Sequence, residues 1–514
     1  MDRHDMNREI ELKLECEPAA LERVRRSRAL SRLQTGPARA RLLHSVYFDT
    51  PDFALLKEGL ALRVRETEGK RIQTLKTGSE GGTLASNRGE WETPLASGEE
   101  APALNHLPAD LRARIAELAN GEAISPRLTS RIRRTARTLQ TPEGDEIELA
   151  IDNGMLSADG REMPVSEFEL ELKRGAPAGL YRLALELADI VPVRIGLRSK
   201  AERALALAGD EKPAAIRAEM LSLAPGLTVE DAYVVILRHC LTHLLMNEAV
   251  TVDGSLPEGL HQMRVALRRM RSAFTVFRRV IGKDHVRRLS QEARWLATSI
   301  GRARDFDVFT SEILTPVEAE NPGDEGLAAL RAAAGKAQVS AWAGARASLR
   351  SSRMTRFVLE LALYLDERSW RGAGQDAAAL GAPIADFASR ALDRRYRSVS
   401  RLGRHIEDLD TTERHDLRKR LKRLRYASGF FASLYPHAAT RHYFRALSKL
   451  QDDFGALNDV ETAGAIIKEL AAIEPDLAAP GKRVLAHHER RARKQWQSAL
   501  DEWRAFRDGG VFWR

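Results

Sequence analysis

The apolar and polar residues of this chain follow two different periods along its length. Up to about residue 205, charged and apolar residues alternate, as in Glu9-Ile-Glu11-Leu-Lys13, and turn sequences such as Glu68-Gly-Lys separate the runs. A period of two with intervening turns is typical of β-strands. From about residue 227, Leu, Ala and Arg recur at helical spacing almost to the C-terminus. The pattern predicts a strand-rich domain over residues 1–208, a linker over residues 209–226 and a helical domain over residues 227–508.

The helical region contains an internal repeat. The segment 261–271 (HQMRVALRRMR) matches the segment 415–425 (HDLRKRLKRLR), which begins 154 residues later. Asp305 is matched by Asp459 at the same offset. The duplication predicts two half-repeats, about residues 227–317 and 327–508.

Each copy places its basic residues on one side of a helix. At about 100° per residue, those of the first copy fall within an arc of roughly 80°, and Met263, Leu267 and Met270 fall opposite. A basic face on one helix is commonly a solvated face, but a solvated face has no reason to keep its register in two copies. Repulsion along the face also costs a few tenths of a kcal/mol per pair, which a bound anion would relieve. We therefore expect two surfaces that bind a polyanion: a first basic stripe of His261, Arg264, Arg268 and Arg271, and a second basic stripe of His415, Arg418, Lys419, Lys422 and Arg425.

The strand-rich region concentrates charges of one sign on single strand faces. Because alternate residues of a strand share a face, Arg63 lies beside Arg65, and Glu169 lies beside Glu171. A sheet with one solvated face gives the same alternation, but its polar face commonly mixes Ser, Thr, Gln and Lys. Runs of Glu or of Arg favour a closed barrel of about eight strands that turns these faces into a hydrated tunnel. Its apolar outside is expected to pack against two helices, near residues 109–119 and 180–190.

Such a tunnel is suited to phosphoryl transfer. Clustered carboxylates bind hard divalent cations such as Mg²⁺ or Mn²⁺ through oxygen, and Arg and Lys side chains hold phosphate oxygens. The reaction requires little beyond positioning, charge neutralisation and a placed water. The sequence contains no Walker loop and no G-x-S-x-G segment that would indicate another chemistry.

The net charge is distributed unevenly along the 514 residues. The formal net charge is +9, of which residues 1–224 carry about −2 and residues 225–514 about +11. This asymmetry indicates a polyanionic partner for the helical half. Nucleic acid is disfavoured as that partner, because the basic stripes contain no aromatic residue on which bases could stack.

Three features indicate a cytoplasmic protein without a membrane partner. The two cysteines, Cys16 and Cys240, cannot form a disulfide framework, which is typical of a reducing compartment. The N-terminus is charged from its second residue, unlike a signal peptide. The longest apolar stretch, near residues 232–246, is interrupted by Arg238 and His239 and is too short to cross a bilayer.

The strand-rich region resembles the CYTH, or triphosphate tunnel metalloenzyme, family. Its opening Glu9-Ile-Glu11-Leu-Lys13 matches the E-x-E-x-K signature of that family. Further segments follow in the family's order: Tyr47-Phe-Asp49-Thr, Leu-Arg63-Val-Arg65, Thr-Leu-Lys76, Arg88-x-Glu90, Glu169-Leu-Glu171 and Ser199-Lys200-Ala-Glu-Arg203. The resemblance spans about residues 5–205, and the ordered set is far more specific than any one of its motifs.

The helical region, about residues 227–508, resembles the CHAD domain. The basic segments that begin at His261 and His415 match the two half-repeats of that family, as do Arg304-Asp305-x-Asp307 and Asn458-Asp459. CHAD domains resemble polyphosphate-binding modules, so long-chain inorganic polyphosphate is the expected partner. The acidic residues of the repeats are expected to position the basic side chains.

Together the two resemblances imply a fold class and an activity. The fold class is α+β with two domains: an N-terminal eight-stranded antiparallel β tunnel with surrounding helices, and a C-terminal all-α domain of two pseudo-symmetric helical bundles. The activity is the hydrolysis of inorganic tripolyphosphate to pyrophosphate and phosphate, dependent on Mg²⁺ or Mn²⁺.

The resemblance to the CYTH family also implies roles for single residues. The catalytic residues would be Glu9, Glu11, Lys13, Lys76 and Lys200. The substrate-binding residues would be Arg63, Arg65, Arg88, Arg131, Arg133 and Arg203. The metal-binding residues would be Glu9, Glu11, Glu169, Glu171 and Asp152.

Several alternatives stay open at this point. The same tunnel would serve an adenylate cyclase or a thiamine triphosphatase, and a non-catalytic polyphosphate-binding protein is disfavoured by the retained carboxylates. A one-residue shift in the segment Arg131-Ile-Arg133-Arg134 would exchange the arginines that point inward. Glu148 and Asp152 alternate as well, so the sequence does not decide which carboxylates bind metal directly. It leaves the oligomeric state open.

Overall fold

The computed structural model describes residues 8–78, 84–96, 98–209, 214–253, 256–372 and 376–514, without the side chains of residues 452–453, 455–459 and 492–494. Residues 210–213 of the expected linker and the side chain of Asp459 therefore lie outside the described residues. The chain divides into two compact units. The tunnel unit comprises residues 1–213 and 350–369, and the helical unit comprises residues 214–349 and 370–514.

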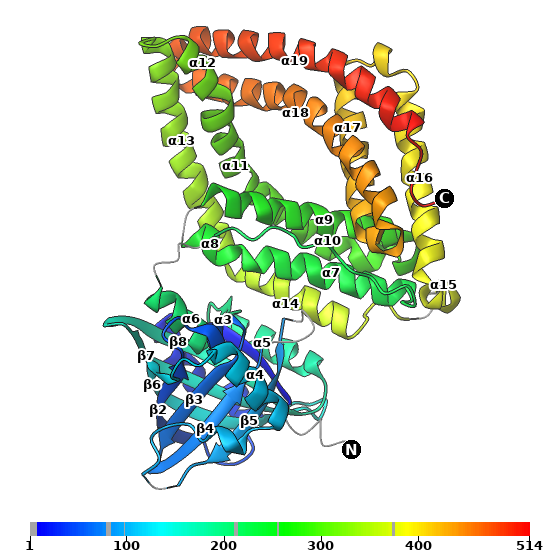
Figure 1. Cartoon of the computed structure of the whole chain (residues 1–514). Helices are drawn as coiled ribbons and strands as arrows, with labels where there is room; N and C mark the ends of the chain where they lie inside the picture. The colour runs from blue at the N-terminus through cyan, green and yellow to red at the C-terminus, as the bar shows by residue number, and fades with distance from the viewer. Residues whose placement is uncertain (1–7, 79–83, 97, 210–213, 254–255, 373–375) are drawn as a thin grey trace. The chain divides into compact units, whose positions relative to one another are not determined.

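The tunnel unit is built around a closed barrel of antiparallel strands (Figure 1). The strands are β1 (Arg8–Glu15), β2 (Arg39–Asp49), β3 (Ala61–Thr67), β4 (Lys70–Lys76), β5 (Ser86–Pro94), β6 (Ser125–Gln140), β7 (Glu146–Ala158) and β8 (Arg161–Arg174). They adjoin in the order β5-β4-β3-β2-β6-β7-β8-β1, and β1 also pairs with β5, which closes the ring. The two-residue strand β9 (Arg194–Ile195) pairs with the end of β1. The predicted eight-stranded tunnel is confirmed.

Two of the barrel's hairpins are closed by two-residue turns. Glu68 and Gly69 connect β3 to β4 with φ angles of 50° and 74°, and Asp159 and Gly160 connect β7 to β8 with φ angles of 47° and 75°. Positive φ at both turn positions matches the right-handed twist of the paired strands. The turn at Glu68-Gly69 is one that the sequence pattern predicts.

Helices cover the apolar outside of the barrel. They are α1 (Pro18–Arg25), α2 (Arg28–Leu33), α3 (Ala54–Lys57), α4 (Ala109–Ala119), α5 (Pro177–Ile190) and α6 (Lys200–Ala208). Leu12 of β1 and Leu170 of β8 are buried in one cluster with Leu183 of α5. Val64 of β3 is buried in another cluster with Ile115 of α4. The two helices predicted near residues 109–119 and 180–190 are therefore confirmed, together with the strand faces that they cover.

A helix from the second half of the sequence completes the tunnel unit. Helix α14 (Ser352–Asp366) belongs to this unit, whereas the sequence pattern places its residues in the second helical half-repeat. Leu359 is fully buried in the cluster that contains Leu183 of α5. The Thr355 hydroxyl donates a hydrogen bond to the carbonyl oxygen of Val193 at 2.5 Å. The core of the tunnel unit is therefore assembled from two segments that lie far apart in the sequence.

The helical unit contains the remaining α-helices. They are α7 (Val229–Met246), α8 (Glu248–Val252), α9 (Pro257–Ile281), α10 (Lys283–Ser299), α11 (Gly301–Val308), α12 (Thr315–Glu320), α13 (Glu325–Leu349), α15 (Ala377–Gly381), α16 (Ile384–Gly403), α17 (Thr411–Phe431), α18 (His437–Ile473) and α19 (Ala478–Asp508). A π-helical segment, Phe309–Leu314, separates α11 from α12. The longest two, α18 and α19, pack side by side (Figure 1). Among the described residues, no helix is long and apolar enough to cross a membrane.

The two basic helices bury the sides that the sequence predicts. Met263 and Leu267 of α9 are fully buried, as are Leu417 and Leu421 of α17. The apolar side of each helix therefore lies in the core, and the basic stripe lies on the other side.

Corresponding arginines of the two copies make corresponding contacts. Nη1 of Arg264 donates to the carbonyl oxygen of Gly301, and Nη1 of Arg418 donates to the carbonyl oxygen of Phe454. Residues 300 and 454 are related by the sequence offset, so the two acceptors, at residues 301 and 454, differ by one position of the repeat. The two arginines therefore make similar contacts in the two copies.

The packing of α14 predicts that the tunnel unit depends on Leu359. Leu359→Ala removes buried methyl groups and leaves a cavity, so we expect it to lower the free energy of unfolding of the tunnel unit by about 2–5 kcal/mol. Faster amide hydrogen exchange in α5, measured by mass spectrometry on the full chain, would record the loss. Leu42→Ala is the matched control, because Leu42 is 66% exposed in the same unit. Equal exchange in both variants would contradict the packing of α14.

Candidate active site in the tunnel

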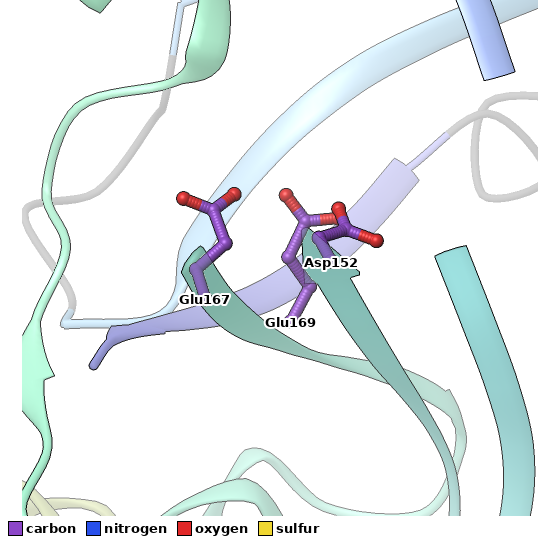
Figure 2. Close-up of side chains that lie close together, drawn as sticks. All are labelled: Asp152, Glu167 and Glu169. Carbon is purple, nitrogen blue, oxygen red and sulfur yellow. The ribbon is translucent and has the colours of Figure 1, made fainter. Parts of the chain in front are cut away.

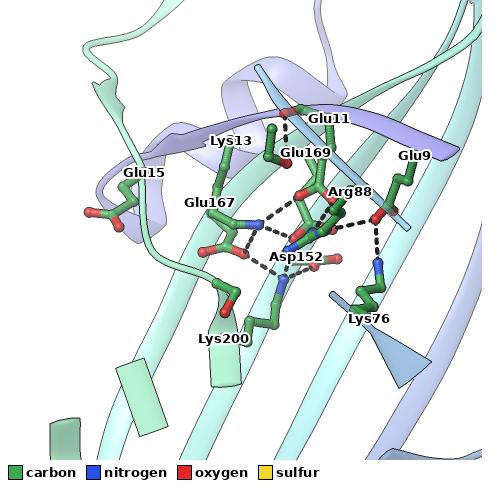
Figure 3. Close-up of polar contacts among 12 residues, drawn as sticks. Glu9, Glu11, Lys13, Glu15, Lys76, Arg88, Asp152, Glu167, Glu169 and Lys200 are labelled. Carbon is green, nitrogen blue, oxygen red and sulfur yellow. Dashed lines mark hydrogen bonds and ion pairs between the residues drawn. The ribbon is translucent and has the colours of Figure 1, made fainter. Parts of the chain in front are cut away.

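The inward faces of the barrel strands carry most of the charged residues named above (Figure 3). Alternate residues of each strand share that face. The inward set comprises Glu9, Glu11 and Lys13 on β1, Arg63 and Arg65 on β3, Lys76 on β4, Arg88 and Glu90 on β5, Arg134 on β6, Asp152 on β7, and Glu167, Glu169 and Glu171 on β8. These side chains form one continuous network of ion pairs and charge contacts.

Three buried carboxylates form the centre of the network (Figure 2). Asp152 and Glu167 are directly opposite each other on β7 and β8, and Glu169 follows two residues later on the same face. Each of the three offers an oxygen, and these oxygens lie within 4.8 Å of one another. We call Asp152, Glu167 and Glu169 the acidic cluster.

Three cations compensate the acidic cluster. Nζ of Lys13 lies 2.5 Å from Glu169, Nζ of Lys200 lies 2.8 Å from Asp152, and Nε of Arg134 donates to Asp152 at 2.8 Å. Burial by itself raises the pKa of Glu169, but Lys13, Lys200 and Arg134 outweigh burial and hold that pKa well below its usual range. The pKa of Asp152 is lowered by the same balance between burial and its two cations. These carboxylates therefore stay ionised inside the barrel.

Lys200 is positioned by the start of helix α6. The Ser199 hydroxyl accepts a hydrogen bond from the backbone N–H of Glu202 at 3.2 Å, and the Glu202 carboxylate accepts one from the backbone N–H of Ser199 at 2.6 Å. This reciprocal pair is a capping box, which fixes where the helix begins. The first residue of the helix, Lys200, is thereby directed at the acidic cluster.

A second ionic group lies beside the first. Nζ of Lys76 lies 2.6 Å from Glu9, and Arg88 bridges Glu9 at 3.0 Å and Glu11 at 2.9 Å. Burial raises the pKa of Glu9, but Lys76 and Arg88 outweigh it and the pKa is lowered. Because Glu11 also contacts Lys13 at 2.7 Å, this group is connected to the acidic cluster.

Two arginines of β3, the buried Arg63 and the partly buried Arg65, are less well compensated. The carboxylate nearest to Arg63 is Glu90, at 3.7 Å. Arg65 donates to the Ser45 hydroxyl at 3.1 Å and has no ion pair within the described part of the chain. Burial and the nearby charges of Arg63 and Arg134 lower the pKa of Arg65 to about 9. Positive charge is therefore in excess on this side of the tunnel, where an anionic ligand would be stabilised. We call the side formed by Arg63 and Arg65 the cationic wall.

Most of the residues predicted for the site meet in this network, and the others lie at its margins. Arg203 pairs with Glu167. Glu171 pairs with Lys173 at 2.5 Å. Burial raises the pKa of Glu171, and the charges of Glu9 and Glu148 add to that effect.

The placement of two predicted arginines is corrected by the structure. Arg131 and Arg133 lie on the exposed face of β6, outside the tunnel. Arg134 points inward instead, because it lies opposite Asp152 in the β6–β7 register. The register differs by one residue from the prediction. Because alternate residues of a strand face opposite sides, this shift points Arg134 into the tunnel and points Arg131 and Arg133 away from it.

Sequence reasoning missed Glu167 and Tyr47 as members of the site. Glu167 precedes Glu169 and Glu171 at the same spacing of two, so the alternation held a signal for it. Tyr47 lies in a quoted motif, and although burial raises the pKa of its phenol, Arg63 and Arg65 outweigh burial and lower it. The phenol oxygen is thus in contact with the cationic wall.

The basic stripes of the helical unit combine anchored and uncompensated cations. Arg264 lies 3.2 Å from Asp305, His415 lies 3.3 Å from Glu461, and Arg425 donates to Gln451 at 3.1 Å. The contact of Asp305 agrees with the expectation that it positions a basic side chain. Arg268 and Arg271 have no ion pair in the part of the chain that the structure describes.

Comparison with known proteins agrees with both units. The model of the CYTH domain family matches residues 7–205, and the model of the CHAD domain family matches residues 235–468. The chain is a CYTH domain followed by a CHAD domain. The resemblance to these two families, which was inferred from the sequence motifs, is thereby confirmed.

Relatives match the two domains together and separately. Uncharacterized proteins from two strains of Mycobacterium tuberculosis are each 27% identical over 423 residues, which cover 78% of this chain and 77% of theirs. A Haemophilus influenzae protein named inorganic triphosphatase is 29% identical over 199 residues, which cover 38% of this chain and 54% of that protein. The crystal structure of the CHAD domain from the plant Ricinus communis is similar at 31% identity and a TM-score of 0.50, over 58% of this chain and 96% of that one.

The acidic cluster of the CYTH domain fits a hard divalent cation. Its donors are all carboxylate oxygens, the ligand type that Mg²⁺ and Mn²⁺ prefer. Ligands at about 2.1 Å on opposite sides of an octahedral Mg²⁺ lie about 4.2 Å apart. The 4.8 Å limit within the cluster therefore requires only a small contraction around an ion. Lys13 and Lys200 would move away from the shared oxygens.

Metal binding by the acidic cluster predicts a loss in Glu169→Gln. We expect the variant to bind Mn²⁺ on the order of 10- to 100-fold more weakly, because a charged oxygen ligand is removed. A Mn²⁺ titration in which electron paramagnetic resonance records the concentration of free Mn²⁺ measures the affinity. Glu162→Gln is the control, since Glu162 is exposed on the same strand. Unchanged Mn²⁺ affinity in Glu169→Gln would place the metal elsewhere.

Proposed function

We propose that the CYTH domain hydrolyses inorganic tripolyphosphate to pyrophosphate and phosphate with Mg²⁺ or Mn²⁺, and that the CHAD domain binds long-chain polyphosphate. The observation that carries the enzymatic proposal is the pairing of opposite charges across one tunnel. Within the described residues, the carboxylate nearest to Arg63 is 3.7 Å away and Arg65 has no ion pair, whereas the acidic cluster faces the same interior. A metal–triphosphate complex would supply a negative charge for Arg63 and Arg65 and a divalent cation for the acidic cluster.

The chain's own residues would bind and orient this complex. Arg63 and Arg65 would hold phosphate oxygens, and Lys76 and Arg88 would neutralise charge on the phosphate that leaves. Asp152, Glu167 and Glu169 would hold the metal, which contributes charge neutralisation when bound. Glu9 and Glu11 extend the carboxylate set and would orient the attacking water. Buried donors and acceptors of this kind act strongly because the barrel wall excludes bulk solvent.

Inorganic tripolyphosphate is proposed over an ester on two grounds. The sequence contains no motif for recognising a base, and the Haemophilus influenzae relative is named inorganic triphosphatase. Adenylate cyclase or thiamine triphosphatase activity in the same tunnel is the alternative. Preferential turnover of ATP or thiamine triphosphate would select that alternative.

Arg65 and Arg133 were both predicted from the sequence to bind substrate, but only Arg65 lies on the cationic wall, so their substitutions should differ in kcat/KM. Arg65→Gln should lower kcat/KM for tripolyphosphate by roughly 10- to 100-fold, because a charge-assisted bond to phosphate is lost. Arg133→Gln, which makes the same change on the outer face of the barrel, should leave kcat/KM unaltered. Initial rates of phosphate release for the two variants decide the matter. A larger loss in Arg133→Gln would mean that the β6 register is wrong.

The proposed polyphosphate binding rests on the first basic stripe, where Arg268 and Arg271 lack ion pairs within the described residues. Arg268→Gln together with Arg271→Gln should weaken binding of long-chain polyphosphate and reduce the slope of affinity against salt concentration, because fewer counterions are released. Arg287→Gln, on α10 and 64% exposed, is the matched control. Identical affinity and salt slope in both variants would make the stripe a solvated face.

A further inference from the structure

The helical unit contains a third cationic feature besides the two basic stripes. A cavity of about 240 Å³ lies where α9, α16 and α17 meet. Six arginines line it: Arg278, Arg279, Arg394, Arg395, Arg420 and Arg423. We call it the arginine pocket. Its remaining lining residues are Thr, Val and Ser, so none of the lining side chains is acidic.

Most of this positive charge is uncompensated. Arg420 is anchored by Asp416 at 2.7 Å and by the Ser398 hydroxyl at 3.1 Å. For the other five arginines, the described part of the chain provides no carboxylate at ion-pair distance. Nε of Arg395 is buried without a hydrogen-bond partner. Burial and the charges of Arg394 and Arg423 lower the pKa of Arg395 to about 10.

The arginine pocket begins where the first basic stripe ends. Thr275 and Arg278 continue that stripe along α9, because Thr275 lies four residues after Arg271 and Arg278 lies three residues after Thr275. Arg271 is also close enough to Arg423 for the two charges to interact. On α17, by contrast, Arg423 lies outside the roughly 120° arc that holds the second basic stripe. The pocket therefore terminates one stripe and is not a part of the other.

The size and lining of the pocket select the chemistry of its ligand. Its volume lies below the roughly 300–1,000 Å³ of typical small-molecule sites, so the ligand is compact. None of the lining residues is aromatic, so no base or ring is stacked. Planar guanidinium groups bind phosphate oxygens in pairs. A terminal phosphate with two ionisable oxygens carries nearly two charges at neutral pH, more than an internal unit of a condensed phosphate.

We propose that the arginine pocket binds the terminal phosphate of an inorganic polyphosphate whose following units lie along the first basic stripe. This inference rests on the proposed polyphosphate binding and names the element that is recognised, namely the end of the chain. Binding would then fix the direction of the polymer on α9.

Polyphosphate with free ends and the same polyphosphate with both ends capped as phosphoramidates test the proposal. The full-length protein is used with chelator and with Arg63→Gln and Arg65→Gln in the tunnel, so that the tunnel does not contribute a preference for ends. Free-ended polymer should bind at least about tenfold more tightly, the value of one charge-assisted contact. The double variant Arg395→Gln with Arg423→Gln should bind the free-ended and the capped polymer equally well. The control Arg287→Gln should keep the preference for the free-ended polymer.

Two further double variants distinguish an effect of the arginine pocket from an effect of the first basic stripe and from a loss of the fold. Arg268→Gln with Arg271→Gln should weaken both polymers and keep the ratio between them. Arg395→Lys with Arg423→Lys retains the charge and should keep part of the preference, with an unchanged circular dichroism spectrum. Equal binding of free and capped polymer, or a preference that survives in the glutamine pair, would overturn the proposal.

The proposed hydrolysis is judged by a different readout. Arg395→Gln with Arg423→Gln, in a chain with an intact tunnel, should turn over tripolyphosphate at the rate of the unmodified chain. Absence of turnover in the unmodified chain would contradict the enzymatic proposal and leave the end-group comparison intact. Absence of any polyphosphate binding would overturn both the proposed CHAD function and the end-group site.

Discussion

The tunnel depends on the balance between three buried carboxylates and the cations that hold them ionised. An isolated carboxylate in such surroundings would take up a proton, because its desolvation costs several kcal/mol. Lys13, Lys200 and Arg134 prevent this by approaching the acidic cluster from three different elements, β1, α6 and β6. Removal of one partner would leave buried charge uncompensated, at a cost of about 3–5 kcal/mol. The same contacts therefore stabilise the barrel and keep a set of oxygen ligands available for a metal.

Incompletely compensated positive charge occurs in both units. At Arg63 and Arg65 of β3, at Arg268 and Arg271 of the first basic stripe, and in the arginine pocket, cations outnumber the carboxylates at ion-pair distance within the described residues. Like charges at such distances destabilise a folded chain unless a counter-charge arrives from outside. All three places are consistent with ligands built from linked phosphates. The ligands proposed for these three places therefore belong to one chemical class.

Alternation along single strands was enough to predict the barrel, its inward charges and its two flanking helices. It was not enough to fix β6, because three arginines within residues 131–134 present charge on both faces, and only the pairing of Arg134 with Asp152 settles the register. The packing of α14 could not be predicted from the sequence either. Leu359 contacts α5 although the two lie far apart in the sequence, and the apolar face of a helix does not indicate which element it packs against. The arginine pocket was missed because three helices supply it and no single helix displays it.

The most direct measurement is phosphate release from tripolyphosphate, ATP and thiamine triphosphate in parallel, with Mg²⁺, with Mn²⁺ and with chelator. A tunnel that pairs a cationic wall with an acidic cluster should release phosphate from tripolyphosphate when either metal is present, stop in chelator and act weakly on the two esters. Turnover that persists in chelator would contradict a role for the acidic cluster in holding a metal. Absence of turnover on all three substrates would contradict the assignment of the tunnel as a catalytic site.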